Sequence, residues 1–255
     1  MSKKPIIILG MGEIAGVFAR GFLRSGYPVY PVTRQMDIQQ QAKIIPEPEL
    51  VLIAVAEKDI QESLQSIPDQ WKESLALLQN ELLPNDWQQH QLNPTVISVW
   101  FEKKKGQDYK VLIPSPAYGS KAKVLLDSLA SIDIAARELN NAEELLFELV
   151  VKNVYILTTN IAGLKTGGSV SELWSNHQSF ARKVASEIIL LQKELTGKCF
   201  DTEKLIDAML IAFNGDPNHG CMGRSAPARL QRALMLAEQH HLNMPTLKEI
   251  ASDVN

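Results

Sequence analysis

The sequence predicts an α/β fold in which a mostly parallel sheet flanked by helices is followed by an all-helical domain. Two observations predict this. In the first half, short apolar runs typical of buried strands alternate with helical stretches, which is the pattern of β-α-β units. After Glu138 the strand pattern fades and long amphipathic stretches dominate. We therefore expect a sheet domain over residues 1–139 and a helical domain over residues 140–255.

Seven apolar runs supply the expected strands, and four amphipathic stretches supply the expected helices of the second domain. The strands are expected over residues 6–9, 29–33, 50–54, 75–79, 96–101, 110–113 and 132–137. The helices are expected over residues 142–164, 170–196, 202–213 and 226–241. Asn141 is expected to cap the first of these helices, with Glu144 completing a capping box. The three lysines before Gly106 are expected at the solvated tip of a hairpin.

The clearest local motif joins the first strand to the helix that follows it. Gly10, Gly12 and Ala15 form a G-x-G-x-x-A pattern directly after the first apolar run. Gly10 permits a tight turn, Gly12 lets the backbone approach a pyrophosphate, and Ala15 or Gly16 lets the helix pack close to the strand. The N–H groups at the start of that helix then face the phosphates. The residues expected to bind a dinucleotide are Gly10, Met11, Gly12, Glu13, Ile14 and Ala15; the alternative is a turn that binds nothing.

Arg34 stands at the end of the second predicted strand, where a dinucleotide fold meets the adenosine ribose. An acidic residue there would accept hydrogen bonds from the 2′-hydroxyl, whereas a guanidinium offers its charge and planar fork to a 2′-phosphate. Arg34 therefore favours NADP over NAD. Asp37, which lies beyond the strand, keeps NAD as the alternative.

Composition restricts the class of protein. The chain has 255 residues, 45% of them hydrophobic, which is sufficient for a large core. A net charge of −3 predicts no nucleic-acid partner, and no apolar run approaches the ~20 residues of a membrane span. Cys199 and Cys221 are too few for a disulfide framework, and Cys221 with His219 is too small a ligand set for zinc. We expect a cytoplasmic protein without a metal, whose exposed apolar helix faces favour a homodimer.

Lys152 is the best candidate for a catalytic group in the second half. It lies in an otherwise apolar helical stretch, where burial would lower its pKa and ease proton transfer near neutral pH. A carbonyl that accepts a hydride needs such a proton donor beside its oxygen. Asn160 follows eight residues later, within ~80° of Lys152 around the helix, and could hold a substrate oxygen. A substrate site is expected in a cleft between the two domains.

Several of these segments together resemble the ketopantoate reductases (2-dehydropantoate 2-reductases). The segments are the glycine turn, Arg34, Asn80 after the fourth strand, residues 152–164 with Lys152 and Asn160, and the ending over residues 229–245. The resemblance spans nearly the whole chain. It implies a Rossmann-type domain followed by a helical domain like that of 6-phosphogluconate dehydrogenase. It also implies NADPH as the cofactor, Lys152 as the catalytic lysine, and catalytic roles for Asn160 and Asn80, with Asn80 near the nicotinamide.

Departures from the family pattern fall mainly on substrate contacts. Ile156 stands where the first helix asparagine is expected, Ala56 where a lysine is expected, and Glu81 where a glycine is usual. Residues 220–225 do not offer the family's serine and acidic residue in an obvious register. Because a buried polar site built for one substrate rejects analogues strongly, these changes favour a different substrate or a lost activity. We expect the reductase chemistry to act on a small 2-oxo acid.

The glycine-rich segment over residues 214–225 is a candidate substrate loop. Arg224 could pair with a substrate carboxylate, with Ser225 beside it. The alternative is a helix connection whose glycines and Asp-Pro pair only make turns. Two other functions remain open at this point. One is a dinucleotide-binding scaffold or sensor without catalysis, and the other is an opine-type dehydrogenase that acts on an imine.

Overall fold

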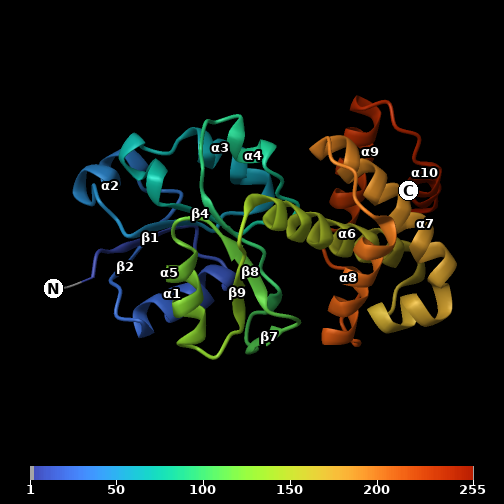
Figure 1. Ribbon diagram of the computed structural model, residues 1–255, viewed down its shortest axis with the longest axis horizontal. Helices are drawn as coiled ribbons and strands as arrows, with labels where there is room; N and C mark the ends of the chain where they lie inside the picture. Colours follow the sequence, from blue (N-terminus) through green and yellow to red (C-terminus); the bar gives the residue numbers. More distant parts are fainter. Residues whose placement is uncertain (1–2, 255) are drawn as a thin grey trace. The chain divides into compact units, whose positions relative to one another are not determined.

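The computed structural model describes residues 3–254, and these divide after Leu149 into two compact units. The named strands all belong to the first unit, and the five long or terminal helices α6 to α10 make up most of the second (Figure 1). The predicted division lay at residues 139 and 140, just before α6 begins at Ala142. The division between the compact units falls inside α6, because its first two turns pack on the sheet.

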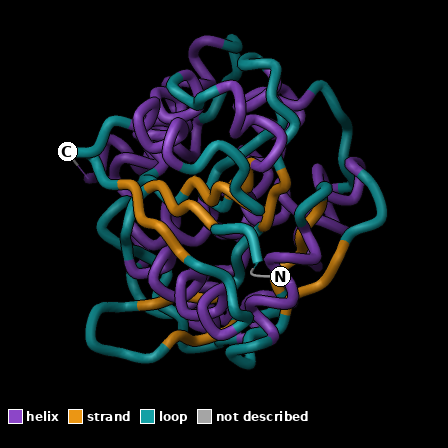
Figure 2. Tube along the Cα trace, turned by 90° about the vertical axis from the view of Figure 1, so that its left-hand side faces the viewer, coloured by secondary structure: helices purple, strands orange, loops and turns teal. Residues whose placement is uncertain are grey.

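Within the described residues, seven strands of the first unit form one twisted sheet (Figure 2, strands in orange). Their order is β2-β1-β3-β4-β5-β8-β9; pairing is parallel from β2 to β5, antiparallel between β5 and β8, and parallel between β8 and β9. The strands are β1 Ile6–Leu9, β2 Val29–Val32, β3 Leu50–Ile53, β4 Leu75–Leu77, β5 Thr95–Ile97, β8 Ser115–Tyr118 and β9 Ala136–Glu138. A separate antiparallel hairpin pairs β6 Phe101–Lys103 with β7 Tyr109–Val111.

Both faces of this sheet are buried, because successive residues of a strand point to opposite sides. Ile7 and Leu9 belong to one apolar cluster, and Ile6 and Ile8 belong to the other. The second cluster lies under α1 (Glu13–Arg24) and α5 (Ala122–Ala130). These two helices approach closely at Gly21, where an added Cβ would lie 2.5 Å from the carbonyl oxygen of Ser128. The other face is covered by the short helices α2 Ile38–Ile44, α3 Ile60–Gln65, η2 Asp69–Ser74 and α4 Asn85–Gln88, and by Leu145 and Leu149 at the start of α6. The short turn η1 Glu57–Asp59 precedes α3 and has no buried residue.

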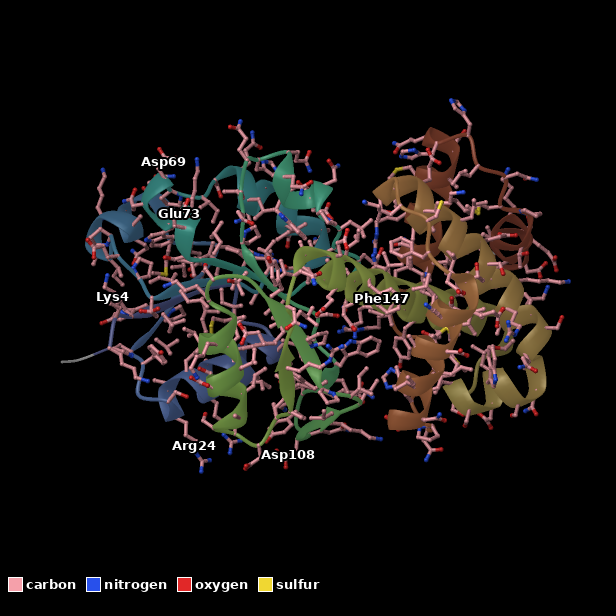
Figure 3. The ribbon with its side chains drawn as sticks, viewed as in Figure 1. Lys4, Arg24, Asp69, Glu73, Asp108 and Phe147 are labelled. Carbon is pink, nitrogen blue, oxygen red and sulfur yellow. The ribbon has the colours of Figure 1, made fainter. Side chains whose placement is uncertain are left out.

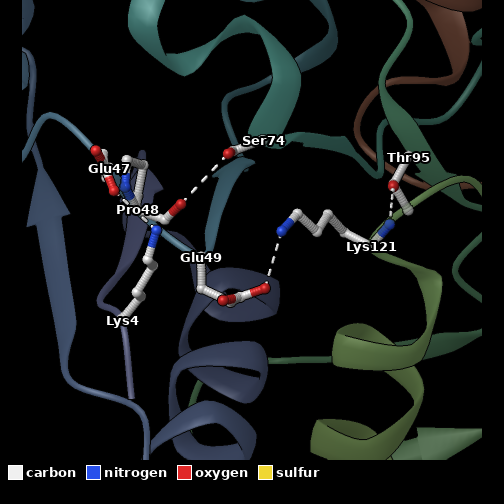
Figure 4. A network of polar contacts seen from close by, with 7 residues as sticks. All are labelled: Lys4, Glu47, Pro48, Glu49, Ser74, Thr95 and Lys121. Carbon is white, nitrogen blue, oxygen red and sulfur yellow. Dashed lines mark hydrogen bonds and ion pairs between the residues drawn. The ribbon is translucent and has the colours of Figure 1, made fainter. Parts of the chain in front are cut away.

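Polar contacts tie together the amino ends of the parallel strands (Figure 4). Lys121, just before α5, pairs with Glu49 at 2.9 Å, and its backbone N–H donates to Oγ1 of Thr95 at 2.9 Å. Ser74 donates to the carbonyl of Pro48 at 3.3 Å, and Lys4 pairs with Glu47 at 2.9 Å. This network lies at the edge opposite to the one where open α/β sheets bind ligands, so we assign it a structural role.

The second unit is built around α7 (Val170–Thr196), which packs against the three helices that follow it in the sequence. These are α8 Thr202–Gly215, α9 Ala226–Gln239 and α10 Pro245–Val254. Glu187 of α7 accepts the backbone N–H groups of Thr246 and Leu247 at 2.8 and 3.0 Å, and so caps the start of α10. Helix α6 (Ala142–Thr166) joins α7 through a buried hydrogen bond from Asn153 to Gln192 at 2.9 Å.

Helix α6 is long and apolar enough to cross a membrane by length and composition, which the sequence analysis did not anticipate. Of its most apolar window, 72% is buried inside the fold. Its apolar side chains thus already have protein partners, as in the core helix of a folded domain, and the helix is weak support for a membrane span. Figure 3 shows the half-buried Phe147 on α6 and the exposed charged residues Lys4, Arg24, Asp69, Glu73 and Asp108 of the first unit.

The fold class predicted from the sequence is confirmed, and the bounds of α7 agree residue for residue. Asn141 accepts the N–H of Glu144 at 2.9 Å as expected, while the Glu144 carboxylate returns to the N–H of Asn140 rather than to that of Asn141. The run over residues 96–101 is split between β5 and β6. Strand β8 was missed because Pro116 argues against a strand. Helix α10 was missed as well.

Candidate functional site

A cavity of about 900 Å³ opens at the carboxyl ends of β1, β2 and β3. Its lining comes from the last residues of β1 and β2, from the loops that follow the three strands, and from α2, η1 and α3. The lining residues are Leu9, Gly10, Met11, Gly12, Val32, Thr33, Arg34, Met36, Ile38, Ala54, Val55, Ala56, Asp59, Glu62, Ser63 and Ser66. This is the edge at which open parallel sheets bind their ligands, and the volume lies within the range of small-molecule and cofactor sites.

The glycine turn forms one wall of the cavity. Gly10 has a φ of +84°, and a Cβ there would lie 2.9 Å from the carbonyl oxygen of Ala54, so glycine is required by both backbone and space. Gly12 caps α1 in an extended conformation, and no atom lies within 4 Å of an added Cβ. The turn therefore leaves open space in front of the first N–H groups of α1, where an anion is stabilised.

The remaining turn residues divide between cavity and core. Met11 lines the cavity and is 50% exposed. Ala15 is buried and Ile14 packs in the cluster beneath α1, as expected for residues that seat the helix on the strand. The Glu13 carboxylate lies 3.6 Å from the ammonium of Lys103. Glu13, Ile14 and Ala15 are not part of the cavity lining, so their expected contacts with a dinucleotide stay predictions.

Arg34 lies at the rim of the same cavity, in a turn closed by the bond from the Met36 N–H to the Thr33 carbonyl at 3.0 Å. Its side chain is 87% exposed and pairs with Asp59 at 3.4 Å. Asp37, the alternative determinant, accepts the N–H groups of Gln39 and Gln40 and caps α2. Asp37 caps a helix and does not line the cavity, whereas Arg34 does. Of these two candidate determinants of cofactor preference, Arg34 is therefore the one that a ligand in the cavity would meet.

Asn80 follows β4 and is partly buried. It donates from Nδ2 to Glu57 at 3.1 Å, and the neighbouring Gln79 donates to the carbonyl of Ile53 at 2.8 Å. The two amides thereby join the ends of β3 and β4 at the ligand-binding edge of the sheet. Asn80 is not among the residues that line the cavity.

Lys152 lies on α6 in the second unit, half-buried, with its ammonium 5.8 Å from the centre of the Tyr155 ring. Burial, followed by the positive charge of Arg229, lowers its pKa to about 7. The pKa of Lys152 is thus lowered, which is the direction expected from the sequence. An amine with this pKa is divided between its charged and neutral forms at neutral pH, and so can both give and take a proton there.

Asn160 is held by three neighbours. Its Oδ1 accepts from Arg229 at 2.8 Å, and its Nδ2 donates to the carbonyl of Cys221 at 3.2 Å and to Oγ1 of Thr159 at 3.4 Å. Arg229 thus touches Asn160 directly and acts on Lys152 electrostatically. The sequence analysis missed Arg229. The sequence does contain a feature that could have identified it, because an arginine stands within the apolar stripe of α9. The apolar residues of that stripe include Ala226, Leu230, Ala233 and Ala237.

The candidate substrate loop is anchored at one end and exposed at the other. The N–H of Cys221 donates to the carbonyl of Gly168 at 2.9 Å, and the carbonyl of His219 accepts from Val170 at 2.8 Å. Arg224 and Ser225 are exposed immediately before α9, and Ser225 makes no side-chain bond as helix cap. The structure thus brings Lys152, Asn160 and Arg229 into one cluster. Among the described residues, 3–254, no hydrogen bond or ion pair joins Arg224 to this cluster.

No family model and no curated protein sequence matches this chain. Solved structures match along nearly its whole length. A PanE/ApbA family ketopantoate reductase from Ralstonia eutropha JMP134 is 14% identical, covering 98% of this chain and 97% of that one, with a TM-score of 0.68. A dimeric ketopantoate reductase from Staphylococcus aureus is 14% identical over 98% and 97% of the two chains, with a TM-score of 0.67.

A third similar structure is a D-mandelate dehydrogenase, in a ternary complex with NADH and anilino(oxo)acetate. It is 13% identical over 98% of this chain and 97% of that one, with a TM-score of 0.67. At such low identities these likenesses concern the fold alone. They confirm the predicted resemblance to ketopantoate reductases at the level of the fold.

Proposed function

We propose that the protein is an NADP-dependent oxidoreductase, similar to ketopantoate reductase, that reduces a small 2-oxo acid or performs the reverse oxidation. The observation that carries the proposal is Lys152, a half-buried lysine whose pKa lies near 7. It occurs in a fold whose solved examples include ketopantoate reductases and a mandelate dehydrogenase with bound NADH. Residues 3–149 would hold the cofactor, and the second unit would supply the proton.

The cavity of the first unit fits a dinucleotide. Gly10 has a backbone that other residues would strain, and Gly12 leaves free space in front of α1, which suits a pyrophosphate. Arg34 offers a guanidinium at the rim, where an adenosine 2′-phosphate would lie. When bound, the reduced nicotinamide supplies the hydride. The residues of the turn would bind the pyrophosphate and so orient the cofactor, and Asn80, which follows β4, would help to position the reacting groups.

Lys152 would act as the general acid. As the carbonyl carbon gains a hydride, negative charge grows on its oxygen, and the protonated amine donates a proton to that oxygen from Nζ. In the reverse direction the neutral amine accepts the same proton. Asn160, fixed by Arg229 and Cys221, would orient the substrate oxygen by exchanging the 3.4 Å bond from its Nδ2 to Thr159 for one to that oxygen. A homodimer is part of the proposal, and one structurally similar ketopantoate reductase is dimeric.

The test measures NADPH oxidation over a panel of small 2-oxo acids. We expect turnover with at least one of them and a loss of at least ~100-fold in kcat for Lys152→Ala, with NADPH affinity nearly unchanged. The matched control is Lys165→Ala on the same helix, because Lys165 is exposed and pairs with Glu249 and Asp253 at 2.6 and 2.8 Å. Tight NADPH binding without Lys152-dependent turnover would instead support a non-catalytic scaffold or sensor. Turnover only with imines would support an opine-type dehydrogenase.

A further inference from the structure

The charged side chains around the cavity of the first unit bear on which dinucleotide it selects. Arg34 comes from the turn after β2, whereas Asp59 and Glu62 come from the segment after β3. Acidic groups therefore outnumber basic ones in the lining. A 2′-phosphate that approaches Arg34 must also approach these carboxylates, which repel it, whereas an unphosphorylated ribose brings no charge to this rim.

Arg34 and Asp59 form an ion pair, and Asp59 is the more rigidly held of the two residues. Its N–H donates to the carbonyl of Ala56 at 2.9 Å, and its own carbonyl accepts from Oγ of Ser63 at 2.8 Å. Its side chain is 31% exposed, against 87% for Arg34. The flexible guanidinium thus reaches across the rim to a carboxylate that the backbone holds in place.

We infer that Asp59 is a specificity-determining residue of this cavity, which keeps the preference for a 2′-phosphorylated dinucleotide small by occupying Arg34. The inference rests on the proposed function. A 2′-phosphate gains from Arg34 only after it displaces the Asp59 carboxylate, and that carboxylate stays nearby as a like charge. A ribose 2′-hydroxyl has no such competitor and can donate a hydrogen bond to the carboxylate.

The first experiment measures the dissociation constants of NADPH and NADH by fluorescence titration of the full chain. In Asp59→Asn the ratio of NADH to NADPH dissociation constants should rise by roughly tenfold, as expected for removing one charge beside a phosphate near the surface. The matched control is Asp69→Asn. Asp69, labelled in Figure 3, is likewise ion-paired, with Lys72 at 2.7 Å, but it is more exposed than Asp59 and is not among the residues that line the cavity. An unchanged ratio in Asp59→Asn, or an equal rise in Asp69→Asn, would overturn the inference.

A double-mutant cycle tests whether Asp59 acts through Arg34. Arg34→Ala alone should weaken NADPH far more than NADH. In the Arg34→Ala background, Asp59→Asn should recover only the part of the tenfold gain that comes from removing the direct repulsion between the carboxylate and the 2′-phosphate, because no guanidinium remains to be released. The full gain in that background would contradict the role assigned to the ion pair. If the wild-type chain binds neither dinucleotide, the proposed function fails together with this inference, whereas binding with an insensitive ratio contradicts this inference alone.

Discussion

The two units build their candidate sites by different means. In the first unit, the glycine turn that forms one wall of the cavity depends on backbone geometry at Gly10 and Gly12. In the second unit, the cluster consists of side chains on two helices, with Lys152 and Asn160 on α6 and Arg229 on α9. The geometry of a turn is determined by a few consecutive residues, whereas a side-chain cluster depends on how helices that are far apart in the sequence pack together. Substitutions should therefore have different consequences in the two units.

The largest contrast is expected between the two glycines of the turn. Gly10→Ala adds a Cβ 2.9 Å from a backbone oxygen at a φ of +84°, so it should lower the free energy of unfolding by ~2 kcal/mol or more. Gly12→Ala meets no atom within 4 Å and should leave stability within about 0.5 kcal/mol, yet weaken NADPH at least ~10-fold by filling space in front of α1. Urea unfolding and NADPH titration measure the two effects. Equal destabilisation by both changes would contradict the description of the turn.

A smaller effect is expected for Arg229→Met in the second unit. Arg229 helps to hold the pKa of Lys152 low, so removing its charge should raise that pKa. The pH above which 2-oxo acid reduction declines should move upward, and kcat should fall about tenfold as Asn160 loses one of its three partners. Arg182→Met removes a partly exposed arginine that pairs with Glu203 at 2.9 Å, and should shift neither quantity. An unchanged pH profile in Arg229→Met would contradict the conclusion that the charge of Arg229 lowers the pKa of Lys152.

Features formed by residues close together in the sequence could be predicted, whereas contacts between residues far apart in the sequence could not. The strand, glycine turn and helix over residues 6–24 are contiguous, and Arg34 follows the next strand directly, so their shared location followed from the pattern. Asp59 was not identified, because its contact with Arg34 joins segments 25 residues apart. Arg229 was missed for the same reason, since its bond to Asn160 spans 69 residues. The roles given to Lys152, Asn160, Asn80, Arg224 and Ser225 stay predictions.

The most direct test of the account is the pH dependence of kcat/KM for reduction of the best 2-oxo acid substrate, from pH 5.5 to 9.5. Reduction requires the protonated amine of Lys152, whose pKa is lowered to about 7, so activity should be greatest below that pH and fall about tenfold per pH unit above it. The reverse oxidation should show the opposite trend. A reduction rate that stays level through pH 9.5 would contradict the assignment of Lys152 as the proton donor.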